Sequence, residues 1–375
     1  MTGTSVRTLF ILGAGASRDA NAPLMFDFMD RANRLHLRKE SGWAQDSFRR
    51  VIDARKKLQV AYAKSNVDLD NIENLFSTFE MATLVGRLGN LPEESVHSLP
   101  ADLRYLIMRT IESCIHYKID GVAGEILPPY PYDAFAELLI ALNGFPEAGP
   151  VGVISFNYDL CLEYALARHR RHVFYGITSA HATRTQIPLL KVHGSLNWFQ
   201  NPSTGAIDPV DIKLPSTKTY FDRWGLERQG LRPIDTMELL FGSDKWGEAL
   251  YPKPVIVPPT WNKGMYQELL KSVWRHAASA LASAENIFVI GYSLPPSDQF
   301  FRSFYSLSTI SDTMIDRFWV FDPSDSEDAT ARYRSLLGPA IRDRGKFQHK
   351  RLRFTKALED IATAFGFTTT PLDDP

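Results

Sequence analysis

The sequence has few of the features that would export a protein, anchor it in a membrane or build a metal site. Its 375 residues include two cysteines, Cys114 and Cys161, too few for a zinc ribbon or a disulfide framework. No apolar run approaches the roughly 18 residues of a membrane span, and no signal-peptide pattern opens the chain. The net charge of −1 gives no overall basic surface for nucleic acid. We expect a cytoplasmic protein with no metal, no membrane contact and no direct nucleic-acid surface.

What the chain does contain is a series of short apolar runs, most of them followed by small or polar residues. The expected strands are residues 8–12, 151–156, 188–192, 254–257, 286–290 and 318–321. Strands that alternate with loops and helices are typical of a parallel sheet covered by helices on both faces. The sequence therefore predicts an α/β fold with a Rossmann-like, doubly wound and mostly parallel sheet.

A long stretch with helical patterns separates the first two expected strands. It is larger than one crossover connection needs. We predict a single domain over residues 1–375, with a helical insert at about 43–149 and an irregular segment at about 201–253. The insert is expected to cover one edge of a nucleotide cleft or to form an oligomer surface.

The first expected strand leads directly into a glycine-rich turn, Gly13-Ala14-Gly15-Ala16-Ser17. Backbone N–H groups in such a turn can approach a phosphate closely. The third glycine of the dinucleotide fingerprint is replaced here by Arg18, and Gly-x-Gly also occurs as a plain tight turn. Alone, the turn is weak evidence for a nucleotide site.

The other expected strands supply further polar groups at their carboxyl ends, where ligands bind in doubly wound sheets. These groups are Asn157, Asp159, residues 193–195, residues 291–293 and Asp322. Each has an ordinary structural interpretation; Asp159, for example, can cap the helix that follows. Because all of them, with the glycine-rich turn, fall at the same edge of the predicted sheet, a shared ligand site is the better interpretation.

Four spaced motifs resemble those of the sirtuin superfamily, in the same order, from about residue 8 to 322. The glycine-rich turn and Ala20-Asn21-Ala22-Pro23 resemble the family's Gly-Ala-Gly-Ile-Ser and Ala-Gly-Ile-Pro. Ser155-Phe156-Asn157-Tyr158-Asp159 is similar to Thr-Gln-Asn-Ile-Asp, and Val192-His193-Gly194 is similar to Leu-His-Gly. Gly291-Tyr292-Ser293-Leu294 resembles Gly-Thr-Ser-Leu.

Three departures separate the chain from the protein deacylases of that family. Leu24-Met25-Phe26 replaces Asp-Phe-Arg, Phe156 replaces a glutamine, and the deacylases' zinc cysteines are absent. In these respects the chain resembles bacterial sirtuin-like proteins of anti-phage defence, which hydrolyse NAD. That resemblance implies an effector that depletes cellular NAD, needs no metal, forms a homo-oligomer and works with a separately encoded HerA-like ATPase or other defence partner.

The resemblance also implies roles for particular residues in the conversion of NAD+ to ADP-ribose and nicotinamide. Asn157 would orient the ribose hydroxyls and the attacking water, His193 would be the general base, and Asp159 would hold the nicotinamide carboxamide. The residues expected to bind the rest of the dinucleotide are Gly13, Ala14, Gly15, Ala16, Ser17, Pro23, Ser155, Gly291, Ser293, Asp298 and Asp322.

Three alternative functions stay open: an NAD-dependent protein deacylase, a catalytically idle nucleotide-binding scaffold, and a dehydrogenase. The missing zinc ligands disfavour the deacylase. The presence of both Asn157 and His193 argues against the idle scaffold. No catalytic constellation supports a dehydrogenase.

Overall fold

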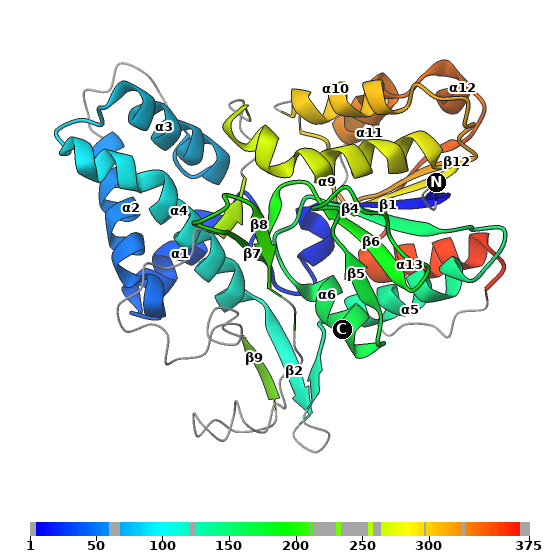
Figure 1. Cartoon of the computed structure of the whole chain (residues 1–375), viewed down its shortest axis with the longest axis horizontal. Coiled ribbons are helices and arrows are strands. Elements are labelled where there is room, and N and C mark those ends of the chain that lie inside the picture. Colours follow the sequence, from blue (N-terminus) through cyan, green and yellow to red (C-terminus); the bar gives the residue numbers. More distant parts are fainter. Residues whose placement is uncertain are drawn as a thin grey trace.

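The centre of the molecule is a seven-stranded sheet in which every neighbouring pair is parallel, with the order β13-β12-β11-β1-β4-β6-β5 (Figure 1). The computed structural model describes residues 5–59, 68–120, 125–210, 212, 230–233, 254–257, 264–295, 298–324 and 327–367. The strands are β1 Thr8–Leu12, β4 Val151–Ser155, β5 His172–Phe174, β6 Gln186–Lys191, β11 Asn286–Ile290, β12 Arg317–Phe321 and β13 Phe347–Lys350. The predicted doubly wound α/β fold is confirmed.

The middle strand β1 and its two neighbours, β4 and β11, end at the same position along the sheet. Leu12 pairs with Ser155 of β4 on one side and with Ile290 of β11 on the other. All five residues of β1 are buried, as are those of β4 and β11, which explains their nearly continuous apolar sequences. The polar residues that follow these strands are therefore brought to one edge of the sheet.

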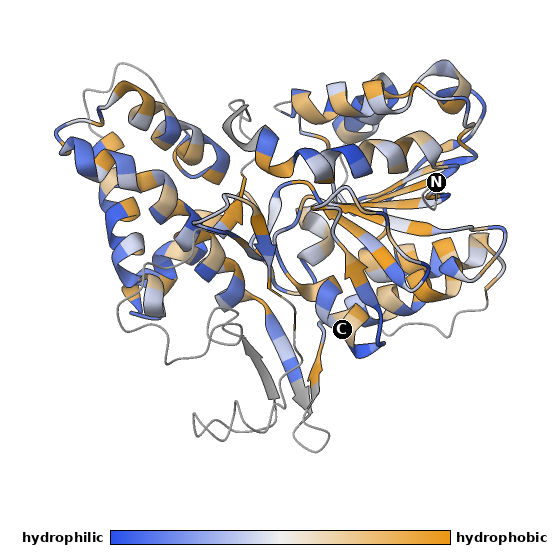
Figure 2. Ribbon diagram, in the orientation of Figure 1, coloured by the Kyte–Doolittle hydropathy of each residue, from blue (hydrophilic) through white to orange (hydrophobic). Residues whose placement is uncertain are grey.

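Helices cover both faces of this sheet (Figure 2). Alternate residues of β1 contact opposite layers. Leu9 and Ile11 belong to a core shared with α9 Gly264–Ser283, α10 Gln299–Ser308 and α11 Glu327–Leu336. Phe10 and Leu12 belong to the core shared with α5 Tyr132–Asn143, α6 Cys161–Arg168 and α13 Phe354–Ala364. The short α12 Pro339–Arg342 follows α11.

A lobe of four helices lies beside the sheet, on the left of Figure 1. Its helices are α1 Phe28–Leu37, α2 Gln45–Leu58, α3 Ile72–Val85 and α4 Glu93–Cys114, with a short 3-10 turn at Gly42–Ala44. After α4 the chain forms β2 His116–Asp120 and β3 Glu125–Leu127, which join β9 Gly230–Pro233 in an antiparallel sheet. The last helix of the predicted insert, α5, packs on the central sheet against α6 and α13. The predicted domain boundaries stay a prediction.

One expected strand was assigned to the wrong sheet. Residues 254–257 form β10 Pro254–Ile256, which pairs antiparallel with β7 Gly194–Gln200 in a separate sheet completed by β8 Ile207–Pro209. Three apolar residues bounded by prolines indicate a buried strand but carry no information about its partner. The same sequence criterion missed β5 and β13, because edge strands that are partly exposed lack a continuous apolar run.

Two other expectations are only partly covered by the structure. Of the segment predicted to be irregular at 201–253, β8 and β9 lie in described ranges, whereas residues 211, 213–229 and 234–253 lie outside them. Among the described helices, none combines the length and hydropathy needed to cross a bilayer.

The turn from His193 into β7 depends on a glycine. Gly194 has φ of +91°, and a Cβ at this position would lie 1.9 Å from the carbonyl oxygen of Val255. We expect Gly194→Ala to lower the free energy of unfolding by more than about 1 kcal/mol. A strained backbone alone usually costs about 1–3 kcal/mol, and the clash of the new Cβ with β10 adds to that cost. Urea unfolding measures this loss.

Gly144→Ala is the matched control. Gly144 has φ of −91°, and the nearest atom to its added Cβ lies at 3.7 Å. Equal stability of the Gly194→Ala and Gly144→Ala variants would contradict the account of this turn.

Candidate functional site

The glycine-rich turn after β1 lies directly against the turn after β11. The Gly13 amide donates to Ile290 O at 3.0 Å, and the Gly15 amide donates to Gly291 O at 2.9 Å. A Cβ on Gly13 would lie 2.6 Å from Gly291 O, and one on Gly15 would lie 2.9 Å away. This close backbone approach already requires both glycines. It occurs between β1 and β11. After β1 the chain continues toward one edge of the sheet, and after β11 it continues toward the other, and ligands of doubly wound folds usually bind at such a point.

Ser17 ends the 3-10 turn Ala14–Ser17 and is the junction of a buried polar cluster. Its Oγ donates to Asp159 Oδ2 at 2.6 Å, accepts from Asn157 Nδ2 at 3.0 Å and lies 2.7 Å from the Tyr132 hydroxyl. A serine hydroxyl has one proton, so Tyr132 must be the donor in its contact with Ser17. Burial raises the pKa of Tyr132 well above its ordinary value, which keeps that proton in place.

Asn157 follows β4 and is 9% exposed. Its side-chain amide donates to Gly13 O at 2.9 Å and to Ser17 Oγ, while its backbone amide donates to Ser155 Oγ at 3.1 Å. Both side-chain amide protons are used inside the protein. The amide oxygen is therefore the atom that Asn157 can offer to a ligand, as a hydrogen-bond acceptor.

Asp159 is also buried, and both of its carboxylate oxygens accept hydrogen bonds from the protein. Oδ2 accepts from Ser17, and Oδ1 accepts from the backbone amide of Cys161 at 3.1 Å, at the start of α6. The N-cap of α6 is Leu160, so Asp159 does not occupy the capping position that the sequence suggested; its bond to Cys161 is an Asx turn one residue earlier. Asp159 thus supports the glycine-rich turn and α6 at the same time.

His193 lies between β6 and β7 and is 4% exposed. Its ring makes an edge-to-face contact with Phe156 at 5.1 Å and lies 6.5 Å from the ring of Tyr158. Phe156 in turn stacks on Tyr292 at 4.5 Å with an interplanar angle of 6°. This aromatic group joins the ends of β4, β6 and β11 and holds the imidazole next to the turn that carries Asn157.

The remaining predicted residues lie around this centre at different distances. Asp298 accepts from the Tyr292 hydroxyl at 2.6 Å and caps α10 through the Phe301 amide at 2.9 Å, so it is a buried support. Ser293 is exposed and its carbonyl accepts from Arg332. Asp322 follows β12, where its carboxylate accepts from the Ser324 amide.

Contacts decide which of these residues the structure brings together. Gly13, Ser17, Ser155, Asn157 and Asp159 are joined by hydrogen bonds, and Gly15 and Ala16 pack with them against Gly291. Ala14 is exposed on the same turn, whereas Pro23 is buried beyond it.

Three residues of the site region were missed by sequence reasoning. Tyr132, at the start of α5, contacts Ser17 from the end of the predicted insert, and nothing in its spacing indicates this. Lys191 and Glu163 form a buried ion pair of 2.8 Å beneath the Asn157 loop. A lysine inside the apolar run of β6 was the available signal, because a charged residue in a buried strand needs a partner.

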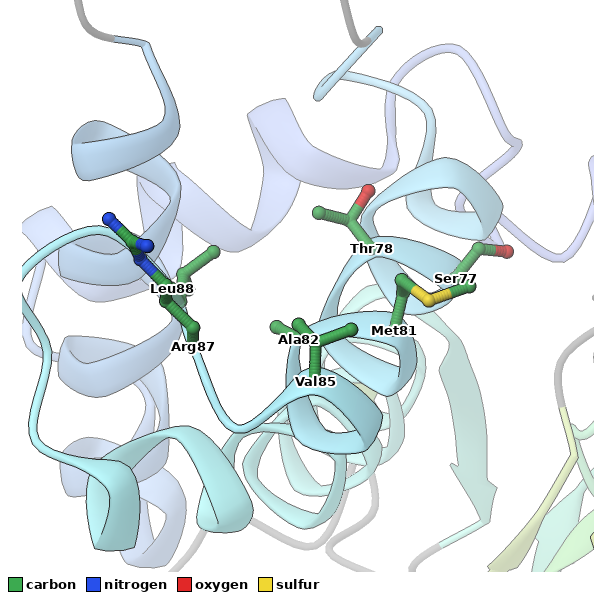
Figure 3. A pocket seen from close by; sticks show the side chains of 7 residues that line it. All are labelled: Ser77, Thr78, Met81, Ala82, Val85, Arg87 and Leu88. Atoms are coloured by element: carbon green, nitrogen blue, oxygen red, sulfur yellow. The ribbon is translucent and has the colours of Figure 1, made fainter.

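Two other features of the described chain lie apart from this site. Asp133, Glu137 and His169 are close enough together to hold a cation, but Asp133 already pairs with Arg168 and His169. A shallow depression of about 400 Å³ lies on α3, lined by Ser77, Thr78, Met81, Ala82, Val85, Arg87 and Leu88 (Figure 3). Its lining holds one ionisable group, so it offers no catalytic constellation.

The protein is a doubly wound α/β protein with its candidate site at the carboxyl edge of the sheet. There the strands β1, β4 and β11 end side by side, the glycine-rich turn lies between β1 and β11, and the buried polar cluster around Ser17 follows. The chain belongs to the SIR2-like family, because the model of the SIR2-like domain matches residues 151–338, half of its length. Members of this family are NAD-using enzymes. The match contains Asn157, Asp159 and His193 but not the glycine-rich turn.

Solved structures with a distant likeness to the chain include Sir2Tm bound to a propionylated peptide, at 11% identity and a TM-score of 0.36, covering 97% of this chain and 95% of that one. Another is Sir2 in complex with the inhibitor EX-527, 2'-O-acetyl-ADP-ribose and deacetylated p53 peptide, at 11% identity and a TM-score of 0.35, covering 96% and 95%. At these values neither likeness bears on the function of this chain. No curated protein sequence matches it.

The Ser17 hydroxyl can be tested by stability. Ser17→Ala removes one bond each from Asn157, Asp159 and Tyr132, all of them buried. We expect the free energy of unfolding to fall by about 1–3 kcal/mol, the range for buried polar groups left unsatisfied. Urea unfolding of Ser203→Ala, at an exposed serine, provides the control. If Ser17→Ala lost no more stability than this control, the hydrogen bonds assigned to the Ser17 hydroxyl would be refuted.

The reactivity of the two cysteine thiols tests whether they are buried in the folded protein. Cys114 and Cys161 are free and buried, and burial raises the pKa of both thiols. The reactive thiolate is thus disfavoured at pH 8, and we expect neither cysteine to react with a thiol reagent until the protein unfolds. Titration of the native and urea-unfolded protein measures this; rapid labelling of the native protein would contradict the described packing.

Proposed function

We propose that the chain hydrolyses NAD+ to ADP-ribose and nicotinamide at the carboxyl ends of β1, β4 and β6. One observation carries the proposal. Ser155 of β4 pairs with Lys191 of β6, and Asn157 and His193 each follow two residues later. An amide acceptor and an imidazole base therefore leave adjacent parallel strands side by side, in a member of a family of NAD-using enzymes.

The chemistry asks for few groups. The bond that breaks joins C1′ of the ribose to the pyridinium nitrogen, so the leaving nicotinamide becomes neutral without being protonated. The enzyme must hold the ribose, stabilise an oxocarbenium-like transition state and place a water on its open face. The amide oxygen of Asn157 can accept from a ribose hydroxyl or from this water. His193 takes a proton from one of them, as histidine commonly does near neutral pH.

The rest of the dinucleotide is proposed to lie along the same edge. Ala14 and Gly15 are exposed on the glycine-rich turn, and Ser293 is exposed on the turn that packs against it. The amides of Gly13, Gly15 and Ala16 already donate to carbonyls within the protein. The Ala14 amide and the Ser293 hydroxyl are therefore the groups proposed to donate to the diphosphate, and the Asp322 carboxylate is proposed to accept from the hydroxyls of the adenosine ribose. Asp159 acts here through Ser17 and Asn157, since both of its oxygens already accept bonds within the protein.

The biological setting is proposed from the motif resemblance. The protein is an effector of anti-phage defence that depletes NAD in the cytoplasm, as a homo-oligomer and with a HerA-like ATPase or other defence partner. The two cysteines lie on different helices, α4 and α6, and cannot supply the zinc module of the deacylases. We therefore propose a metal-free hydrolase rather than a deacylase.

Asn157→Ala and His193→Ala test the reaction. Each is expected to reduce nicotinamide release about 10²–10⁴-fold, the usual contribution of a positioned proton-transfer group. Because both residues serve one step, the double variant should be no slower than roughly the slower single variant. Nicotinamide and ADP-ribose are quantified by chromatography, with an acetylated peptide added in parallel.

Matched controls are Asn74→Ala and His97→Ala, both exposed on the helical lobe, which should keep wild-type rates. Melting temperatures are measured on the same preparations to separate lost chemistry from lost folding. A folded His193→Ala variant that hydrolyses NAD at the wild-type rate, or NAD consumption only with the acetylated peptide, would overturn the proposal.

A further inference from the structure

Lys191 is a buried cation at the end of β6, two residues before His193. It is 1% exposed, and its Nζ donates to Glu163 Oε1 at 2.8 Å, to Tyr158 O at 3.2 Å and to Asp159 O. An ammonium group has three protons, so its hydrogen-bonding capacity is filled. Two of its partners are main-chain carbonyls directly after Asn157.

A buried ion pair is by itself weak evidence for a gain in stability. Removing two charges from water is expensive, and apolar side chains of similar volume often stabilise a fold equally well or better. Burial raises the pKa of Glu163, and the nearby Lys191 offsets this effect in part. We therefore consider a second role for the pair, which is to fix the main-chain carbonyls that Lys191 contacts.

The carbonyls that accept from Lys191 belong to a network of hydrogen bonds between the turn that carries Asn157 and the turn that carries His193. Tyr158 O also accepts from the Leu196 amide at 3.0 Å, and the Tyr158 hydroxyl donates to Val257 O at 3.0 Å. The Val257 amide donates back to His193 O at 2.8 Å. Lys191 is the one side chain of β6 in this set, and it joins the Asn157 turn to the strand that leads to His193.

We propose that Lys191 is a positioning residue for the hydrolysis. Glu163 fixes its ammonium group, the ammonium group fixes the carbonyls of Tyr158 and Asp159, and the separation between Asn157 and His193 is thereby set. This inference rests on the proposed function. Its scale follows from geometry, because a misplacement of about 1 Å can reduce a rate about 10²-fold.

Lys191→Met/Glu163→Leu separates positioning from stability. The double variant removes both charges together, so no unpaired buried charge remains. We expect it to fold, to lose about 10–100-fold in kcat and to keep KM within about threefold, because the hydrogen bonds of Lys191 go to Tyr158, Asp159 and Glu163 and not to the residues proposed to bind the diphosphate or the adenosine ribose. The affinity for ADP-ribose, measured by calorimetry, should likewise be unchanged.

Two further variants sharpen the test. Glu163→Gln leaves an oxygen that can accept from Lys191 but removes the charge that neutralises it, so the melting temperature should fall, while the loss in kcat should be smaller than that of the double variant because both carbonyl contacts remain. Lys271→Met breaks a Lys–Glu pair of 3.0 Å with Glu268 on the surface of α9 and should change neither kcat nor melting temperature.

The outcomes are distinguishable. No nicotinamide release by the wild-type protein would overturn the proposed function. Hydrolysis by the wild type with an equal kcat in folded Lys191→Met/Glu163→Leu would overturn the positioning role alone. If that variant does not fold, Lys191→Arg replaces it: the longer, planar cation is expected to fold with kcat lowered at least about 10-fold at constant KM, and a wild-type kcat would again overturn the role.

Discussion

The hydroxyl group of Ser17 is the point at which the ends of β1 and β4 meet, and the candidate site depends on it. Its single proton goes to Asp159, while its lone pairs accept from Asn157 and Tyr132. All four side chains are buried, so each bond that is lost leaves an unsatisfied polar group. The orientation of the Asn157 amide is thereby fixed, and its oxygen is left for a ligand.

The same principle connects the site to its surroundings. Lys191 ties β6 to the Asn157 turn, and Val257 ties β10 to His193. From the helical lobe, Arg104 of α4 donates to Ile256 O at 3.1 Å, next to Val257. The helical lobe is thus joined through β10 to the backbone of His193, and its predicted place over one edge of a nucleotide cleft stays a prediction.

Sequence reasoning predicted the fold, and it named residues that the structure joins at one edge of the sheet, but it missed the side chains that support them; that these residues bind NAD stays a prediction. β1, β4 and β11 were predictable because buried parallel strands have continuous apolar sequences, and level ends bring their polar residues together. The partner of residues 254–257 was not predictable, since an apolar run does not specify its neighbour. Tyr132 and Glu163 lie on helices, and their contacts with Ser17 and Lys191 exist only in the folded chain. The sequence predicted that the glycines of the first turn let its backbone approach a phosphate, which stays a prediction, whereas the structure shows that they are needed for the close approach of Gly291.

The central claim is that NAD is bound and cleaved where β1, β4 and β6 end, and a crystal structure of the protein with ADP-ribose tests it most directly. The account predicts the diphosphate against residues 14–17 and Ser293, with the ribose C1′ hydroxyl between Asn157 and His193. ADP-ribose bound elsewhere, for instance in the depression on α3, or no bound ADP-ribose at saturating concentration, would contradict the account.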